Sequence, residues 1–280
     1  MVTLQNKVAV VTGGGSGIGR SIALALASAG THVVVADIHI DSAEAVAAEA
    51  QAKGVRALAV RCDVADHGSV AALADAAYST FGTVDILCNN AGISWRPYRS
   101  ILDATLDDWR FMLGINLWGV IHCLDAFLPR MRRQAGEKHI VNTASLGGLI
   151  PMEGHSIYSA GKAAVVGLSE AIAAELAPHG FGVTIFCPGS VRTNLGENTV
   201  RIRGEVPAEL QQQFEPVATP TLQRFAKLPI ISAEDAGTMV CQAIRDNTLY
   251  LHSAALPHDL IADRVHRVYG PQTLPRAGKD

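Results

Sequence analysis

A tyrosine and a lysine four positions apart, Tyr158 and Lys162, form the pair in this sequence that is best suited to proton transfer. If a helix begins near residue 156, the two side chains share one of its faces, because positions i and i+4 are neighbours on a helix. A free tyrosine has a pKa of about 10, which is too high for efficient proton transfer at neutral pH. An ammonium about 4 Å away, at an effective dielectric constant of about 20, supplies about 4 kcal/mol, or about 3 pKa units. The alternative is an ordinary surface contact between two helix residues.

Two further polar residues, Ser145 and Asn116, are candidates to act beside this pair. Ser145 directly follows a predicted strand over His139–Ala144, so it lies at the sheet edge where the helix of Tyr158 begins. Asn116 lies inside a predicted helix over Asp107–Arg133, although asparagine is a poor helix former. The alternative for Asn116 is a side chain that faces solvent or bonds to its own helix.

A glycine-rich turn follows the first predicted strand. Its residues run Thr12-Gly13-Gly14-Gly15-Ser16-Gly17-Ile18-Gly19. Glycines let the backbone approach a diphosphate closely, and the N-terminus of the following helix attracts the negative charge. The turn departs from the strict pattern Gly-x-Gly-x-x-Gly, and a P-loop is excluded because no Gly-Lys-Ser/Thr follows. The alternative is a plain strand-to-helix turn.

Acidic and amide side chains follow the next strands along the chain. Asp37 ends the second predicted strand, where dinucleotide-binding folds place a carboxylate on the adenosine ribose. Asp63 follows the third strand, and Asn89-Asn90-Ala91-Gly92 follows the fourth. Asp and Asn are also ordinary turn residues. Because ligands of open α/β sheets bind outside the carboxyl ends of the strands, the three loops together predict a dinucleotide groove.

Short apolar runs alternate with alanine-rich amphipathic stretches along most of the chain. Strands are expected over Lys7–Thr12, His32–Asp37, Ala57–Cys62, Val84–Asn89, His139–Ala144, Gly182–Cys187 and Thr248–His252, and helices over Gly17–Ala29, Asp41–Lys53, Gly68–Phe81, Asp107–Arg133, Ser156–His179, Ala233–Asp246 and Asp259–Tyr269. Near-continuous apolar strands are typical of a parallel sheet buried on both faces. We therefore predict an α/β fold, a single-domain Rossmann-like doubly wound parallel sheet of about seven strands over residues 1–280, with helices on both faces. The proline-containing stretch 188–232 is predicted to be a long loop with a short helix or two, and with a substrate lid within 190–232.

Taken together, these motifs resemble the short-chain dehydrogenase/reductase family, specifically its shorter single-domain type. The resemblance covers residues 7–195, and within them two further motifs match, Asp63-Val64 and Pro188-Gly189-x-Val191-x-Thr193. It implies that Tyr158 exchanges a proton with the substrate oxygen, that Ser145 holds this oxygen, that Lys162 binds the nicotinamide ribose, and that Asn116 anchors a water. The cofactor contacts that it implies are Gly13, Ser16, Gly17, Ile18, Gly19, Asp37, Asp63, Val64, Asn90, Ala91, Gly92, Tyr158, Lys162, Pro188, Gly189, Val191 and Thr193.

Asp37 also predicts which dinucleotide is bound. Its charge should repel a 2′-phosphate, and neither Ser16 nor Ile38 offers a positive charge beside it. Three basic residues lie near enough in the sequence to remain candidates for pairing with a 2′-phosphate, namely Arg20, His39 and Arg61. We predict NAD as the cofactor and no metal.

The implied reaction is hydride transfer between nicotinamide and a secondary alcohol or ketone. The alternative is a dinucleotide-binding regulator that kept the fold without turnover, and the complete catalytic set favours the enzyme. Candidates for an apolar substrate wall, which predict a bulky hydrophobic or aromatic substrate, are Leu146, Leu149, Ile150, Met152, Trp95, Pro97, Tyr98, Leu195, Phe214 and Phe225. The alternative is that these residues only pack the loops. For His155 there are also two interpretations, a contact with the substrate or an ordinary loop histidine.

The net charge and the cysteines indicate which partners and which cellular compartment to expect for this protein. The net charge of −3 does not favour binding to nucleic acid or to an anionic membrane. Five widely spaced cysteines without Cys-x-x-Cys predict reduced, mostly buried thiols in a cytoplasmic protein. No run approaches about 18 consecutive apolar residues, and no export signal is recognised at the N-terminus. A small-residue face, Ala163, Gly167, Ala171 and Ala174, fits either the homodimer or homotetramer that the resemblance implies or packing on the chain's own sheet.

Overall fold

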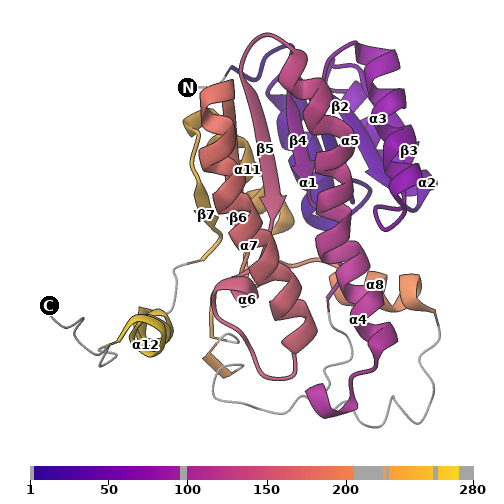
Figure 1. The fold of residues 1–280 in the computed structure, drawn as a ribbon. Helices are drawn as coiled ribbons and strands as arrows, with labels where there is room; N and C mark the ends of the chain where they lie inside the picture. The colour runs from indigo at the N-terminus through magenta and orange to yellow at the C-terminus, as the bar shows by residue number, and fades with distance from the viewer. Residues whose placement is uncertain (1–2, 95–99, 205–222, 225–226, 255–257, 271–280) are drawn as a thin grey trace, which may run out of the picture.

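Seven parallel strands form one continuous sheet at the centre of the molecule (Figure 1). The strands are β1 (Val8–Thr12), β2 (His32–Asp37), β3 (Ala57–Arg61), β4 (Ile86–Asn89), β5 (Lys138–Thr143), β6 (Phe181–Cys187) and β7 (Tyr250–His252). Their order across the sheet is β3-β2-β1-β4-β5-β6-β7. The computed structural model describes residues 3–94, 100–204, 223–224, 227–254 and 258–270. The predicted doubly wound parallel sheet is confirmed.

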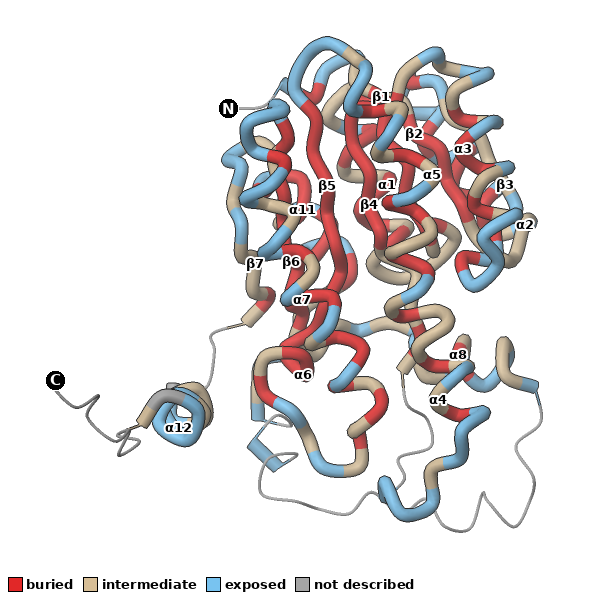
Figure 2. Tube along the Cα trace, viewed as in Figure 1, coloured by how far each residue is buried: buried red, intermediate tan, exposed pale blue. Residues whose placement is uncertain are grey.

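Helices cover both faces of the sheet. One face carries α1 (Gly17–Ser28), α2 (Ile40–Gln51) and α11 (Ala233–Asp246), and the other carries α3 (His67–Phe81), α5 (Gly119–Arg133) and α7 (Ser156–Leu176). Neighbouring residues of one strand enter opposite cores: Val10 packs on the side of α3, α5 and α7, and Val11 on the side of α1, α2 and α11. Both valines are fully buried, which explains the unbroken apolar runs, and Figure 2 shows the central strands buried along their length.

Shorter elements gather at the carboxyl ends of the strands (Figure 1). They are α4 (Leu106–Leu113), α6 (Leu146–Leu149) and α8 (Leu195–Arg203). The predicted helix Asp107–Arg133 is present, but a π-helical turn, η2 (Gly114–Trp118), interrupts it between α4 and α5. The remaining elements are η1 (Ile101–Asp103), η3 (Ala177–His179) and α12 (His258–Tyr269). Helix α8 lies within the stretch predicted to be a lid, whereas the sequence pattern gave no sign of α6.

The helix that runs from α4 through α5 is apolar enough to need comment. By length and composition alone, Leu106–Arg133 could cross a membrane. Its α5 part nevertheless packs against the sheet through buried side chains that include Cys123, Phe127 and Met131. This is the position of a core helix.

The thiols have the state that their spacing predicted. All five cysteines are free and buried. Cys62 follows β3, and burial raises its pKa to about 11, so this thiol stays protonated at neutral pH. In the parts of the chain that the structure describes, no group of three or more His, Cys, Asp or Glu side chains is arranged to hold a metal ion.

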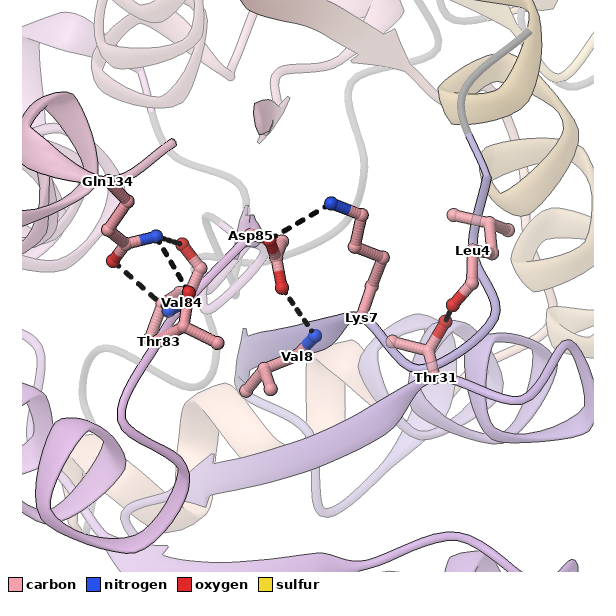
Figure 3. A network of polar contacts seen from close by, with 8 residues as sticks. All are labelled: Leu4, Lys7, Val8, Thr31, Thr83, Val84, Asp85 and Gln134. Atoms are coloured by element: carbon pink, nitrogen blue, oxygen red, sulfur yellow. Dashed lines mark hydrogen bonds and ion pairs between the residues drawn. The ribbon is translucent and has the colours of Figure 1, made fainter. Parts of the chain in front are cut away.

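Polar contacts hold the amino-terminal edge of the sheet (Figure 3). Asp85, just before β4, accepts hydrogen bonds from the Val8 amide at 2.9 Å and from the Lys7 ammonium at 3.2 Å. Gln134, just after α5, donates to the Val84 carbonyl at 2.9 Å and accepts from the Val84 amide at 3.3 Å. These contacts tie together the starts of β1 and β4. The glycine turn follows the far end of β1, and Asn90-Ala91-Gly92 follows that of β4.

A buried histidine near the start of β5 predicts acid sensitivity. His139 is fully buried, its Nε2 lies 2.8 Å from Thr184 Oγ1, and burial lowers its pKa from 6.5 to about 4. As the pH falls, the unfolded chain therefore takes up a proton on this ring before the folded protein does. The stability associated with neutral His139 is complete above pH 6.5 and is lost as the pH falls to about 4, a change on the order of 3 kcal/mol.

We expect the free energy of unfolding to fall more steeply between these pH values in the wild-type protein than in His139→Gln. Glutamine cannot take up a proton in this range, and its amide can still bond to Thr184. Urea titrations at a series of pH values measure the difference. Equal pH slopes for the two proteins would contradict the assignment.

Candidate active site

A cleft opens at the carboxyl edge of the sheet, around the point between β1 and β4 where the winding of the strands reverses direction. Open α/β sheets bind their ligands at this switch point. Most residues predicted to contact the cofactor line the cleft: Gly13, Ser16, Gly17, Ile18, Gly19, Asp37, Asp63, Val64, Asn90, Ala91, Gly92, Tyr158, Lys162, Pro188 and Thr193. The structure thus brings motifs from distant parts of the sequence into one cleft.

The glycine turn after β1 is packed so tightly that its glycines cannot carry side chains. A Cβ atom on Gly19 would collide with the carbonyl oxygen of Gly13, and one on Gly13, whose φ is +61°, would lie 2.9 Å from Ala91 Cα. Asn90 Nδ2 donates to the Thr12 carbonyl at 3.0 Å, and Thr12 Oγ1 accepts from the Asn90 amide at 3.0 Å. The turn therefore presents bare backbone beside the N-terminus of α1, an arrangement that fits the diphosphate of a dinucleotide.

Asp37 lines the cleft at the end of β2 and also holds the glycine turn. Its Oδ2 accepts a hydrogen bond from the Gly15 amide at 2.9 Å, and its Oδ1 accepts one from the His39 amide at 3.0 Å. A Cβ atom on Gly15 would lie 2.9 Å from the same Oδ2. The carboxylate is therefore held in one orientation by backbone amides while it faces the cleft.

Lys162 is buried, with 4% of its surface exposed, and lines the cleft. Its Nζ donates a hydrogen bond to the Thr143 carbonyl at 2.7 Å and lies 5.9 Å from the centre of the Tyr158 ring. Burial lowers the pKa of this lysine from 10.5 to about 8, so at pH 7 it is still mostly protonated. The ammonium lies near the ring on the shared helix face, as the i,i+4 spacing predicted.

Asn116 lies in the π-helical turn η2 and is fully buried, so its side chain does not face solvent. Its Oδ1 accepts a hydrogen bond from the Ile93 amide, and its Nδ2 donates one to the Ile93 carbonyl, both at 2.9 Å. A Cβ atom on neighbouring Gly92 would lie 3.0 Å from Asn116 Oδ1 and 3.5 Å from Lys162 Nζ. Asn116 thus holds the loop after β4 beside Lys162, and π-helical turns often occur at functional sites.

Ser145 and Tyr158 approach each other around Gly147. Ser145 caps the short helix α6, and its Oγ accepts a hydrogen bond from the Gly147 amide at 3.0 Å. A Cβ atom on Gly147 would lie 3.5 Å from both Ser145 Oγ and Tyr158 Cε1. His155 is buried nearby, with its ring centre 5.8 Å from that of Tyr158. Ser145 and His155 therefore both lie near the Tyr158 ring, which Lys162 Nζ approaches as well.

Four of the predicted site residues do not line the cleft itself: Asn116, Ser145, Gly189 and Val191. Asn116 bonds to Ile93, which does line it, and Ser145 directly follows Ala144, which also does. Gly189 instead donates its amide to Ser253 Oγ at 2.9 Å, and Val191 forms an isolated bridge with Ile231. In this structure the last two hold the chain after β6 against neighbouring segments.

The residues predicted to form the substrate wall have different positions. Leu195 lines the cleft. Leu146 and Ile150 are buried, which supports the alternative that they pack the loops. Trp95, Pro97, Tyr98, Phe214 and Phe225 lie outside the described residues, as do residues 205–222 of the predicted lid.

Helix α8 supplies several cleft residues that the sequence did not single out. They are Asn198, Arg201 and Ile202, with Asn194 just before the helix, and the cleft also includes Ser42, Cys62, Ile93, Ile115, Thr143 and Ala144. Asn198 Nδ2 donates to Ser16 Oγ at 3.1 Å, which brings α8 against the glycine turn. A short helix or two was predicted in this stretch, without bounds, and α8 is such a helix.

Comparison with known sequences agrees with this geometry. The profile of the family described as short chain dehydrogenase matches residues 7–203. The chain is 30% identical over 272 residues to 1-deoxy-11-beta-hydroxypentalenate dehydrogenase of Streptomyces exfoliatus, which covers 97% of this chain and 92% of that protein. It is 40% identical over 191 residues to cyclohexanol dehydrogenase of Acinetobacter sp. strain SE19, which covers 68% of this chain and 75% of that protein.

A solved structure shares the fold. The crystal structure of a short-chain dehydrogenase/reductase from Burkholderia phymatum in complex with NAD superposes with a TM-score of 0.82. The two proteins are 33% identical, and the match covers 96% of this chain and 95% of that chain. Since the family profile spans most of the chain and full-length relatives share its sequence and fold, this chain belongs to the short-chain dehydrogenase/reductase family of oxidoreductases.

Proposed function

We propose that this chain is an NAD(H)-dependent oxidoreductase that transfers a hydride between nicotinamide and a bulky, hydrophobic or aromatic secondary alcohol or ketone. The observation that carries the proposal is that Ser145 and Tyr158 pack around Gly147, with Lys162 Nζ 5.9 Å from the centre of the Tyr158 ring, at a cleft that also contains the glycine turn. A dinucleotide-binding regulator without turnover has no need of this set of side chains.

Each side chain of the set has surroundings that suit its proposed role. When bound, NAD supplies the hydride acceptor and NADH the hydride donor. Tyr158 takes the hydroxyl proton during alcohol oxidation and returns a proton to the ketone oxygen during reduction. Ser145 Oγ already accepts from the Gly147 amide, so its own proton can point to the substrate oxygen. Lys162, held by the Thr143 carbonyl, stabilises the phenolate and binds the nicotinamide ribose.

The preference for a hydrophobic substrate is supported by the apolar side chains in the cleft. Ile93, Ile115, Leu195 and Ile202 line it. Burying an apolar group against such side chains contributes roughly 25 cal/mol per Å². One relative in the family is named for an alicyclic secondary alcohol, cyclohexanol. We therefore propose ring-containing secondary alcohols, or the corresponding ketones, as the substrate class.

A panel of secondary alcohols tests the proposal. We expect NAD to be reduced in the presence of cyclohexanol and α-methylbenzyl alcohol, with kcat/KM about tenfold or more above that for isopropanol. The near-ultraviolet absorbance of reduced nicotinamide gives the rates. NAD binding without turnover across a broad panel of alcohols and ketones would instead support the regulator.

NAD is the proposed cofactor because Asp37 places a negative charge in the cleft at the end of β2. Arg20, the nearest arginine in the sequence to the turn, makes two hydrogen bonds to Glu49, at 2.6 and 3.2 Å. Neither Arg20 nor Arg61 lines the cleft, whereas His39 does. The charge of Asp37 is thus the main determinant proposed at the adenosine ribose.

We expect kcat/KM with NAD to exceed that with NADP by at least about tenfold. One like-charge contact at about 4 Å costs about 4 kcal/mol at an effective dielectric constant of about 20, and exposure to solvent reduces this cost. The double variant Asp37→Asn/Ile38→Arg should narrow or invert the ratio, because it removes the repelling charge and adds a phosphate partner. Asparagine keeps a side-chain oxygen that can accept from the Gly15 amide. A wild-type enzyme that prefers NADP would overturn the role given to Asp37.

We also infer that the chain forms a homodimer or homotetramer. On α7, the small residues Gly167, Ala171 and Ala174 are exposed, so packing on the chain's own sheet does not account for them. A second copy could approach α7 closely along this face. We further propose one domain over residues 1–280 and a cytoplasmic location, in line with the sheet that runs from Val8 to His252 and the five free thiols.

A further inference from the structure

Helix α8 is held over the cofactor edge of the cleft by contacts along its length. Near its start, Asn198 Nδ2 donates to Ser16 Oγ in the glycine turn at 3.1 Å. The next residue, Thr199, is buried and accepts a hydrogen bond at Oγ1 from the Ser94 amide at 3.0 Å. At the end of the helix, Arg203 forms an ion pair with the buried carboxylate of Asp108. The helix is therefore attached both to the glycine turn and to α4.

The ion pair at the end of α8 is a stable anchor. Burial raises the pKa of Asp108, but hydrogen bonds from Thr105 and the contact with Arg203 outweigh it, so the pKa lies below its ordinary value of 3.8. Asp108 therefore stays charged at neutral pH. Arg203 also lies over the Phe111 ring, with the guanidinium carbon 5.6 Å from the ring centre. These contacts fix the helix backbone at Arg201, whose side chain is exposed.

Of the two arginines of α8, Arg201 and Arg203, the one in the cleft lining is Arg201. It lines the cleft, and it follows Asn198 by three positions, so both side chains lie on the same face of α8. Among the described residues that line the cleft there is one lysine, Lys162, and one arginine, Arg201. Lys162 Nζ already donates a hydrogen bond to the Thr143 carbonyl. The other strong charges in the lining are negative, from Asp37 and Asp63.

We infer that Arg201 binds the diphosphate of the dinucleotide from the α8 side, opposite the bare backbone of the glycine turn. The first turn of α1 carries no acidic residue, so its N-terminus and Arg201 present positive charge to the same ligand group. A guanidinium is suited to this role because it can donate two parallel hydrogen bonds to phosphate oxygens. This inference rests on the proposed dinucleotide function and adds a residue to its binding site.

Ligands with and without a diphosphate distinguish this role from a structural one. In Arg201→Met, the Kd for NAD and for ADP-ribose should rise about tenfold, whereas the Kd for adenosine, which has no diphosphate, should not change. Arg201→Lys should recover part of the loss, and ADP-ribose binding to Arg201→Met should depend less on salt than binding to the wild type. Calorimetry for NAD, NADP and ADP-ribose, and NMR titration for adenosine, give the constants without any turnover.

Arg110→Met is the matched control. Arg110 pairs with Asp107 on the exposed side of α4 at 2.8 Å and does not line the cleft, so this variant makes the same change in charge away from the site. Its affinities should equal those of the wild type.

Three results would overturn the inference while leaving the dinucleotide function in place. They are equal affinities for the wild type and Arg201→Met, an equal loss for adenosine, and a loss confined to NADP. A wild-type chain that binds neither NAD nor ADP-ribose would overturn the proposed function together with the role of Arg201.

Discussion

Replacing Tyr158 by phenylalanine should lower kcat by about a thousandfold and leave the Kd for NAD within about twofold of the wild-type value. The substitution removes one hydroxyl from a ring that packs around Gly147 with Ser145 and keeps the ring itself. Because the hydroxyl makes its decisive interaction with the moving proton, the loss should fall on the chemical step and not on cofactor binding.

Tyr78→Phe is the control for this variant. Tyr78 lies on α3 and does not line the cleft, and its buried hydroxyl oxygen has no hydrogen-bond partner among the residues that the structure describes. Its removal should leave kcat unchanged. Steady-state rates and NAD titrations on both variants give the comparison. If Tyr158→Phe retains a tenth or more of the wild-type kcat, another group supplies the proton.

Replacing Lys162 by methionine should damage both cofactor binding and rate, because this ammonium is given two functions. We expect kcat at pH 7 to fall about a hundredfold and the Kd for NAD to rise about tenfold. Methionine fills most of the volume of the buried side chain, so the variant leaves little empty space. Lys138→Met is the control: Lys138 is also buried but lies at the amino end of β5, with Nζ 5.2 Å from the centre of the Phe181 ring.

The pH dependence gives Lys162 a signature of its own. Since burial lowers its pKa to about 8, the wild-type lysine is charged below that pH and loses its proton as the pH rises through it. NAD affinity in the wild type should therefore weaken above about pH 8, and this change should be absent from Lys162→Met. In alcohol oxidation, the rising limb of the rate profile should move to higher pH in the variant, because the phenol loses its positive neighbour. An unchanged profile with normal NAD affinity would contradict the assignment.

The sheet and the cofactor edge could be predicted because their signals are local. Strands such as β2 carry unbroken apolar runs, and the sequence placed both of its ends where the structure has them, at His32 and Asp37. Helix α11 likewise has its predicted bounds, Ala233 and Asp246, with Ser232 as a capping residue. The glycine turn and Asp37 lie at the ends of strands that could be predicted in this way. Most of the residues that line the cleft with them could therefore be predicted too.

The parts that the sequence did not reveal depend on contacts between distant segments. Asn116 lies in the π-helical turn, and its side chain forms two hydrogen bonds with the backbone of Ile93, in the loop after β4. Helix α8 is anchored by Arg203 to Asp108; Asp108 precedes α7 in the sequence, whereas Arg203 follows it. Neither contact leaves a periodic pattern or a short motif. The same reason explains why Arg201 could not be identified from its neighbours in the chain.

Direct transfer of hydride from the alcohol carbon to nicotinamide can be followed with an isotope. Cyclohexanol that carries deuterium at the carbinol carbon is oxidised by the wild-type enzyme with NAD, and the reduced cofactor is analysed by NMR and mass spectrometry. We expect one deuterium on the reduced nicotinamide ring and none released to water, with product formation about a thousandfold slower in Tyr158→Phe. Deuterium lost to solvent, or no reduction of NAD by this or any other ring-containing secondary alcohol, would contradict it.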